Sequence, residues 1–117
     1  MGRLSTHVLD TAAGKPAADM RIDFSVIEGE RWRLVKTLRT NADGRTDAPL
    51  LAPEAMAVGQ YKIEFHVADY FRKQGVALPE PAFFDRVPLR FGIADVNAHY
   101  HVPLLCSPWS YSTYRGS

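Results

Sequence analysis

Hydrophobic and polar residues alternate with a period of two along most of the chain. The residues on the apolar side of this alternation are Leu4, Thr6 and Val8; Ile22, Phe24 and Val26; Trp32, Leu34 and Leu38; Tyr61, Ile63, Phe65 and Val67; and Val87, Leu89, Phe91 and Ile93. Successive side chains of a β-strand point to opposite faces, so the pattern predicts strands with one packed face. Because buried parallel strands read as continuous apolar runs, we expect antiparallel pairing.

Turn-forming residues separate these segments. They are Ala13-Gly14-Lys15-Pro16, Glu28-Gly29-Glu30, Asn41-Ala42-Asp43-Gly44 and the stretch from Pro53 to Gly59. The first turn separates the first predicted strand from the second, and the second turn has the spacing of a β-hairpin. In the third, Asp-Gly supplies a positive φ at little cost, which is typical of a tight turn.

Only the segment 68–75 has the features of a helix, which would be about two turns long. Asp69 is placed to cap it, Gly75 can close it, and Pro79 and Pro81 then force a loop. Roughly seven or eight short strands with one short helix favour an all-β sandwich. The free edges of such sheets favour association with further chains.

Composition and charge narrow the function classes. A length of 117 residues allows one domain, 1–117, and the net charge of +1 gives no electrostatic footprint for nucleic acid or an anionic membrane. No apolar run approaches the roughly 18 residues needed to span a bilayer. The N-terminal residues lack the apolar core of a signal peptide, so we expect a cytoplasmic protein.

Cys106 is the single cysteine, which excludes an intrachain disulfide framework and a cysteine-based zinc site. Its neighbours Pro103, Leu104 and Leu105 predict a small buried hydrophobe. The sequence contains no Gly-rich phosphate loop and no G-x-S-x-G, H-E-x-x-H or C-x-x-C motif, so it gives no sign of a cofactor.

Three histidines interrupt the alternation on its polar side. His7 lies between Thr6 and Val8 and would point away from the packed face. His99 and His101 would share one face of a strand. Such a pair can ligate a metal, move protons, or simply be hydrated, and with no carboxylate or cysteine partner nearby the zinc signal is weak.

Arg45 and the chain end are two further candidates for a binding site. Arg45 follows the Asp43-Gly44 turn, where its planar guanidinium can meet an anionic or carbonyl-rich ligand. The end of the chain offers the hydroxyl of Tyr114, the cation of Arg115, and the hydroxyl and carboxylate of Ser117. Residues this polar form either a half-buried strand or a frayed tail.

Four segments together resemble the 5-hydroxyisourate hydrolases, transthyretin-like enzymes of urate catabolism. They are Leu4-Ser5-Thr6-His7-Val8-Leu9-Asp10, Thr40-Asn41-Ala42-Asp43-Gly44-Arg45, His99-Tyr100-His101-Val102-Pro103-Leu104-Leu105 with Ser107-Pro108, and Tyr111-Ser112-Thr113-Tyr114-Arg115-Gly116-Ser117. The resemblance covers essentially the whole chain. Departures are Cys106, where an aliphatic residue is usual, and Trp109-Ser110, where an aromatic-glycine pair is common.

The resemblance implies a transthyretin-like β-sandwich of two four-stranded sheets with one short helix after the fifth strand. It also implies a homotetramer, a dimer of dimers, with active sites in the channel between dimers. The implied activity is the hydrolysis of 5-hydroxyisourate to 2-oxo-4-hydroxy-4-carboxy-5-ureidoimidazoline. Water would be the only co-substrate, without metal or organic cofactor.

The resemblance also assigns roles to particular residues. His7 and His101 would carry the proton transfers, while Arg45 would orient the substrate and stabilise negative charge. Tyr114 and Ser117 would hold the ring and the water, and Arg115 would bind substrate or pair the tail into the channel. Which histidine activates water, and whether His99 contributes, stay open at this point.

Two other functions compete with this reading. One is a transthyretin-like tetramer that carries a small aromatic ligand without chemistry, and the other is a β-sandwich interaction module with hydrated histidines. A carrier of an apolar ligand has no need of His7, Arg45 and His101 together, which favours the enzyme.

Overall fold

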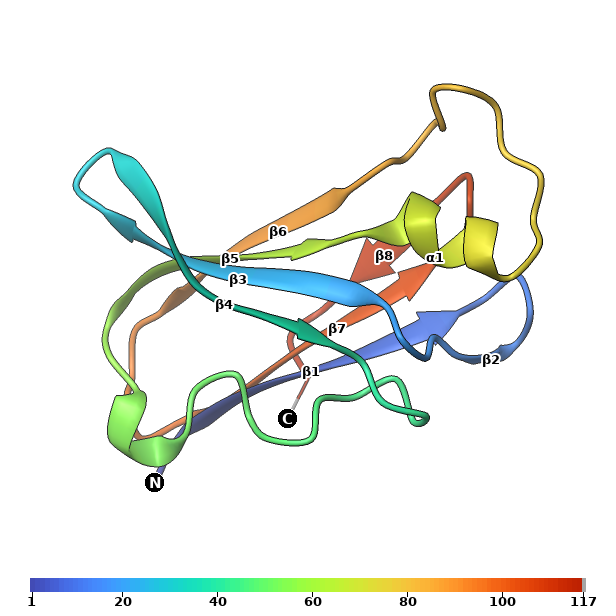
Figure 1. Ribbon diagram of the computed structural model, residues 1–117. Coiled ribbons are helices and arrows are strands. Elements are labelled where there is room, and N and C mark those ends of the chain that lie inside the picture. The colour runs from blue at the N-terminus through green and yellow to red at the C-terminus, as the bar shows by residue number, and fades with distance from the viewer. Residues whose placement is uncertain (117) are drawn as a thin grey trace.

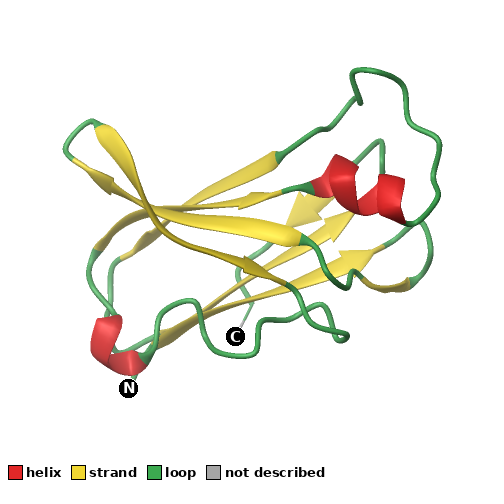
Figure 2. Cartoon of the chain, in the orientation of Figure 1, coloured by secondary structure: helices red, strands yellow, loops and turns green. Residues whose placement is uncertain are grey.

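The computed structural model describes residues 1–116. The strands are β1 (Arg3–Asp10), β2 (Lys15–Pro16), β3 (Arg21–Glu28), β4 (Arg31–Arg39), β5 (Gly59–Phe65), β6 (Val87–Ile93), β7 (His99–Cys106) and β8 (Tyr111–Thr113), with helix α1 (Val67–Lys73) and the 3-10 helix η1 (Pro53–Ala55). They form two four-stranded sheets, β2-β1-β7-β8 and β4-β3-β5-β6, which pack face to face (Figures 1 and 2). This confirms the predicted β-sandwich.

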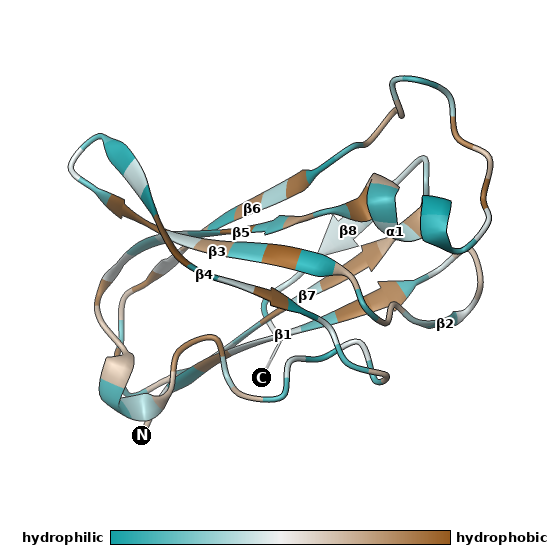
Figure 3. Ribbon diagram, viewed as in Figure 1, coloured by the Kyte–Doolittle hydropathy of each residue, from teal (hydrophilic) through white to brown (hydrophobic). Residues whose placement is uncertain are grey.

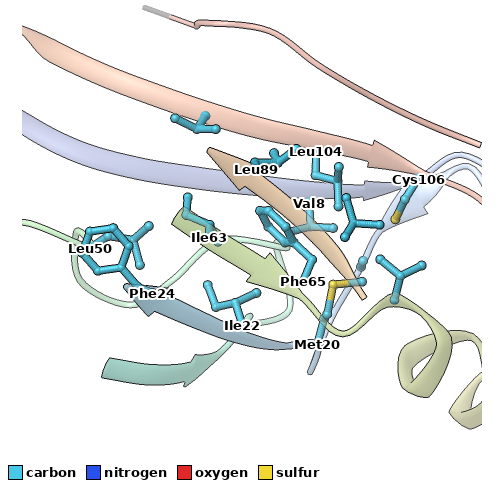
Figure 4. Packing of buried hydrophobic residues seen from close by; sticks show 14 of the residues in the cluster. Val8, Met20, Ile22, Phe24, Leu50, Ile63, Phe65, Leu89, Leu104 and Cys106 are labelled. Carbon is cyan, nitrogen blue, oxygen red and sulfur yellow. The ribbon is translucent and has the colours of Figure 1, made fainter. Parts of the chain in front are cut away.

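The core lies between the two sheets and is built from the apolar side of the alternation. Val8 and Leu104 of one sheet face Phe24, Ile63 and Phe65 of the other, and all five are fully buried (Figure 4). Along the strands, apolar and polar positions alternate as expected for a sandwich with one packed face per sheet (Figure 3). Among the described residues, no helix has the length and apolar character to cross a bilayer.

The pairing of β1 with β7 corrects the expectation of antiparallel strands. These two strands run parallel, from Arg3 opposite His99 to Asp10 opposite Cys106, whereas the other pairs of described strands are antiparallel. Continuous apolar runs mark parallel strands that are covered on both faces. Within residues 1–116, the outward side chains of β1 are only half-buried, so β1 alternates like an antiparallel strand. Strand β7 alternates only as far as His101 and is apolar from Val102 to Cys106.

Strand β4 departs from its predicted pattern at a β-bulge. Phe24 pairs with Lys36 and its neighbour Ser25 with Leu34, so Val35 is the extra residue. One extra residue reverses the faces of all the side chains beyond it. The prediction that Trp32, Leu34 and Leu38 share the packed face is therefore wrong at Leu34, which is 56% exposed, and at Trp32, whose ring packs under Lys62 and Arg90 rather than in the core.

Helix α1 starts at Val67, one residue earlier than predicted, and Asp69 lies in its first turn rather than at the cap, which is His66. Gly75 follows the helix with φ of 85°, as its predicted closing role requires. The segment 13–16, expected only as a break, contributes the short strand β2, and η1 was not expected at all.

Cys106 is buried, as predicted. Burial, followed by the nearby Asp10 carboxylate, raises the pKa of its thiol to about 12, so the thiol stays protonated at neutral pH. Cys106 therefore behaves as a core residue.

Asp23, on the outer face of β3, ties the sheet to the start of α1. Its carboxylate accepts hydrogen bonds from Thr37 and Arg21 and is joined to His66 at 2.9 Å. Burial alone would raise the pKa of Asp23, but these hydrogen bonds outweigh it and lower the pKa from 3.8 to about 2. A lowered pKa means that the ionised form stabilises the fold above pH 4, and that this stabilisation is lost as the pH falls toward 2.

We expect Asp23→Asn to lower the free energy of unfolding at pH 7 by about 2 kcal/mol, which is the free energy that corresponds to the lowered pKa of Asp23. The difference in unfolding free energy between the variant and wild type, called the gap below, should narrow below pH 4. Urea unfolding at several pH values measures it. Asp85→Asn, which changes an exposed carboxylate, is the control and should show no gap. A gap for Asp23→Asn that is equally large at pH 7 and pH 2 would contradict the assignment.

Candidate active site

The polar side of the parallel pair β1–β7 forms one open face. Ser5 and His7 of β1 and His99 and His101 of β7 project from it, because all four have the opposite parity to the core residues of their strands. The register places Arg3 beside His99 and Ser5 beside His101. The structure therefore brings the predicted histidines of both ends of the chain to one sheet face.

A rigid turn delivers Arg45 to the same face. The side-chain oxygen of Asn41 accepts hydrogen bonds from the backbone N–H groups of Asp43 (2.9 Å) and Arg45 (3.1 Å). Gly44 follows with φ of 75° and accepts a hydrogen bond from the N–H of Val8 at 2.8 Å. These contacts pair Arg45 with His7 in an antiparallel bridge.

The backbone of the turn also fixes the ring of His7. Nε2 of His7 lies 2.8 Å from the carbonyl oxygen of Asp43. A carbonyl oxygen can only accept a hydrogen bond, so Nε2 carries the proton and donates. When the ring is neutral, Nδ1 is therefore the nitrogen with a free lone pair.

Gly44 offers a test of how closely this turn is packed against β1. A Cβ at Gly44 would collide with the carbonyl oxygen of Val8, whereas a Cβ at Gly14, which also has a positive φ, would meet no atom within 4 Å. We expect Gly14→Ala to cost only the backbone strain, about 1 kcal/mol, and to leave catalysis unchanged. Gly44→Ala should destabilise the protein further and displace Arg45. Thermal unfolding measures the stability of the two variants, and turnover measures the displacement of Arg45. Equal effects of the two substitutions would contradict the close packing of Gly44 against β1.

The end of the chain folds back across β7. The N–H of Gly116 donates to the carbonyl oxygen of His101 at 2.7 Å, and a Cβ at Gly116 would lie only 2.6 Å from Cδ2 of that histidine. Arg115 stacks on the ring of Tyr100 at 4.3 Å and reaches the carbonyl oxygen of His99. Tyr114 is 60% exposed, and Ser117 lies outside the described residues.

His101 is held in an unusually cationic neighbourhood. Burial first, and then the charges of Arg45, His7 and Arg3, lower the pKa of its imidazole below 6.5. The ring is therefore neutral at pH 7 and can accept a proton. The register places these groups near one another in one cluster, because His7 lies two residues beyond Ser5, the partner of His101, and His7 pairs with Arg45.

Beside this cluster the surface is hollowed. A depression of about 200 Å³ lies between β1 and the segment 45–49, and Arg3, Ser5, Thr46 and Asp47 contribute to its polar lining together with Arg45. Two guanidinium groups at one hollow suit a ligand rich in carbonyl or carboxylate oxygens. Neither His7 nor His101 lines this hollow, but Ser5 does, and its hydroxyl is joined to the ring of His101. The neutral imidazole of His101 can move a proton to or from water beside such a ligand.

The described residues contain one group of potential metal ligands, and it lies on the other sheet. Asp23, Glu64 and His66 bring their ligand atoms within 4.8 Å of one another on the outer side of β3 and β5. Arg21 and Arg86 form ion pairs with the two carboxylates. These pairs account for the cluster as a network of structural ion pairs, apart from His99 and His101.

Sequence reasoning missed three parts of this site: Ser5, Arg3 and the carbonyl oxygen of Asp43. Ser5 shares the parity of His7, which is a visible signal, but its contact with His101 depends on the parallel register of β1 and β7. Arg3 lies opposite His99 in the same register, and its charge helps to lower the pKa of His101. Backbone carbonyl contacts leave no trace in side-chain chemistry and could not be predicted.

The sheet order, the short helix and the polar sheet face together define a transthyretin-like β-sandwich protein. The chain belongs to the HIUase/Transthyretin family, whose model matches residues 4–116. This confirms the resemblance of the sequence motifs.

Particular relatives are similar over the full chain. A 5-hydroxyisourate hydrolase of Ralstonia nicotianae (strain ATCC BAA-1114 / GMI1000) is 62% identical over 117 residues, which cover 100% of both chains. A crystal structure of (S)-allantoin synthase superposes with a TM-score of 0.92 and 47% identity, covering 99% of this chain and 44% of that one. The structure of Klebsiella pneumoniae 5-hydroxyisourate hydrolase matches with a TM-score of 0.81 and 34% identity, covering 100% of this chain and 94% of that one.

Proposed function

We propose that the protein is a 5-hydroxyisourate hydrolase that opens the substrate ring to 2-oxo-4-hydroxy-4-carboxy-5-ureidoimidazoline. The convergence of His7, Arg45 and His101 on one open sheet face carries this proposal. Full-length similarity to an enzyme of that name, at 62% identity, supports it. A carrier of an apolar ligand would gain nothing from two imidazoles and a guanidinium at the same place.

In the proposed reaction, water adds to a ring carbonyl and the adjacent C–N bond breaks. His101 takes the proton from water, because the surrounding cations keep its ring neutral. His7, anchored through Nε2–H, acts in its imidazolium form and gives its Nδ1 proton to the leaving nitrogen. The proton that His101 took from water then returns to His7 through solvent, which restores both rings. Arg45 stabilises the oxyanion, a contribution worth about 3–4 kcal/mol for a fixed donor.

The chain end completes the proposed site. Tyr114 and Ser117 would hold the substrate ring and the attacking water, as the family resemblance implies. Arg115 is a further proposed substrate contact, and its stacking on Tyr100 also supports a role in holding the tail in place. No metal and no organic cofactor takes part in this scheme.

We also propose that the chain forms a homotetramer, a dimer of dimers, whose channel covers the histidine face. The strands β6 and β8 are edge strands of their sheets, which makes them available for pairing with another copy. Light scattering coupled to gel filtration should give four times the mass of 13.1 kDa. A monomeric mass would contradict an active site shared between subunits.

The activity has a direct assay. Purified protein should accelerate the loss of absorbance of freshly generated 5-hydroxyisourate, and incubation with a chelator should leave the rate unchanged. A carrier would bind the compound without speeding its decay, and an interaction module would do neither. Loss of activity on chelation would move the chemistry to a metal and overturn the proposed mechanism.

A further inference from the structure

Ser5 touches the proposed catalytic histidine directly. Its Oγ lies 2.9 Å from Nδ1 of His101, across the parallel pairing of β1 with β7 that sets the two residues opposite each other. Both side chains are half-buried, and no other side-chain hydrogen bond is formed by either of them within residues 1–116. The hydroxyl is therefore a dedicated partner of this ring.

The ring of His101 is also confined on its other side. Gly116 approaches it so closely that a Cβ there would lie 2.6 Å from Cδ2. In an imidazole, Nδ1 and Cδ2 are the two ring atoms attached to Cγ, so Ser5 and Gly116 border opposite sides of the ring. Nε2 lies on the edge of the ring away from Cγ and has no side-chain hydrogen-bond partner among residues 1–116.

The contact with Ser5 determines which nitrogen of His101 can serve as the base. A hydroxyl can accept a hydrogen bond from Nδ1–H or donate one to a bare Nδ1. Because Ser5 engages Nδ1, Nε2 is the ring nitrogen left to meet water. Nε2 can take a proton only while it is bare, so the neutral ring that acts as a base carries its proton on Nδ1 and donates it to Ser5.

We propose that Ser5 is a positioning residue that accepts a hydrogen bond from Nδ1–H of His101 and so presents the lone pair of Nε2 to water. This inference rests on the proposed hydrolase function. In the reacting step, Nε2 takes a proton from the water that forms the new C–O bond. The resulting imidazolium keeps its Nδ1–H bond to Ser5, so the ring need not turn between taking up and releasing the proton.

Kinetics of three variants test this role. Ser5→Ala should lower kcat by about ten- to hundredfold with little change in KM, since a second partner that orients a catalytic group has effects of this size. Ser5→Thr keeps the hydroxyl and should recover most of the activity. Ser112→Ala removes an exposed hydroxyl from β8, on the same sheet face, and is the matched control with unchanged kcat.

Nuclear magnetic resonance tests the proton position without any turnover. The ring signals of His101 are assigned as those missing from the spectrum of His101→Gln. Two-bond ¹H–¹⁵N correlations should then show Nδ1 protonated and Nε2 bare in the neutral ring of the wild type. In Ser5→Ala the proton should redistribute toward Nε2. Thermal unfolding identifies any variant that fails to fold, and Ser5→Thr then carries the comparison.

A neutral wild-type ring with its proton on Nε2 would overturn the proposal, as would Ser5→Ala with wild-type kcat and an unchanged proton position. Failure of the hydrolase proposal would look different. In that case wild-type protein would not accelerate the decay of 5-hydroxyisourate, while the resonance experiment would still report whether Ser5 holds the Nδ1 proton.

Discussion

Replacing His101 by alanine should lower kcat for 5-hydroxyisourate by about 10²–10⁴-fold, the usual contribution of a positioned general base. The fold should survive, because the imidazole projects from the outer face of β7 and is not part of the buried core. The backbone bond from Gly116 to the carbonyl oxygen of residue 101 does not need the side chain either. Initial rates of absorbance decay measure the loss, and circular dichroism checks the strands.

His99→Ala is the matched control for this experiment. His99 lies two residues earlier on the same strand and face, is exposed, and pairs with Arg3 rather than Ser5. We expect its removal to change kcat by less than about threefold, well below the effect of a catalytic acid or base. Equal losses at both positions would point to damage to β7, and wild-type activity in His101→Ala would remove His101 from the mechanism.

Deleting residues 114–117 should abolish measurable turnover while leaving the sandwich nearly intact. The deletion removes Gly116, which borders the ring of His101, together with the proposed substrate contacts Tyr114 and Ser117. The described part of this segment lies outside the strands and the buried core. Far-ultraviolet circular dichroism and substrate decay, measured on the same preparation, separate the two effects.

A single substitution serves as the control for the deletion. Arg115→Gln removes the stacking on Tyr100 but keeps the backbone of the tail in place. It should cost less activity than the deletion, because Gly116 still confines His101. Normal turnover by the truncated chain would show that the tail only packs against the sheet.

Local sequence patterns predicted the strands well, since the period-two alternation follows directly from burying one face of each sheet. They failed where an element depends on its partner. The bulge at Val35 arises from the pairing of β4 with β3, and nothing in the sequence of β4 alone marks it. The parallel direction of β1 and β7 is likewise a property of the pair, and β1 alternates in the way expected of an antiparallel strand.

The candidate site likewise contains residues that a single segment reveals and a contact that depends on the pairing of two strands. His7, Arg45 and His101 were identified as side chains whose chemistry stands out from their segments, and the structure brings them together. Ser5 has an ordinary side chain for an exposed strand position, and only the register of β1 against β7 places it at His101. Its contact could not be predicted from a sequence read as antiparallel strands.

The central claim is that His101 and Arg45 act on the same substrate molecule as parts of one site. Values of kcat for His101→Ala, Arg45→Gln and the double variant test it. When two groups act as a unit, removing both lowers kcat little more than removing either one. We predict that the double variant is within about tenfold of the slower single variant. If the fold-reduction in kcat of the double variant equals the product of the two single reductions, the two residues work independently, and the account is contradicted.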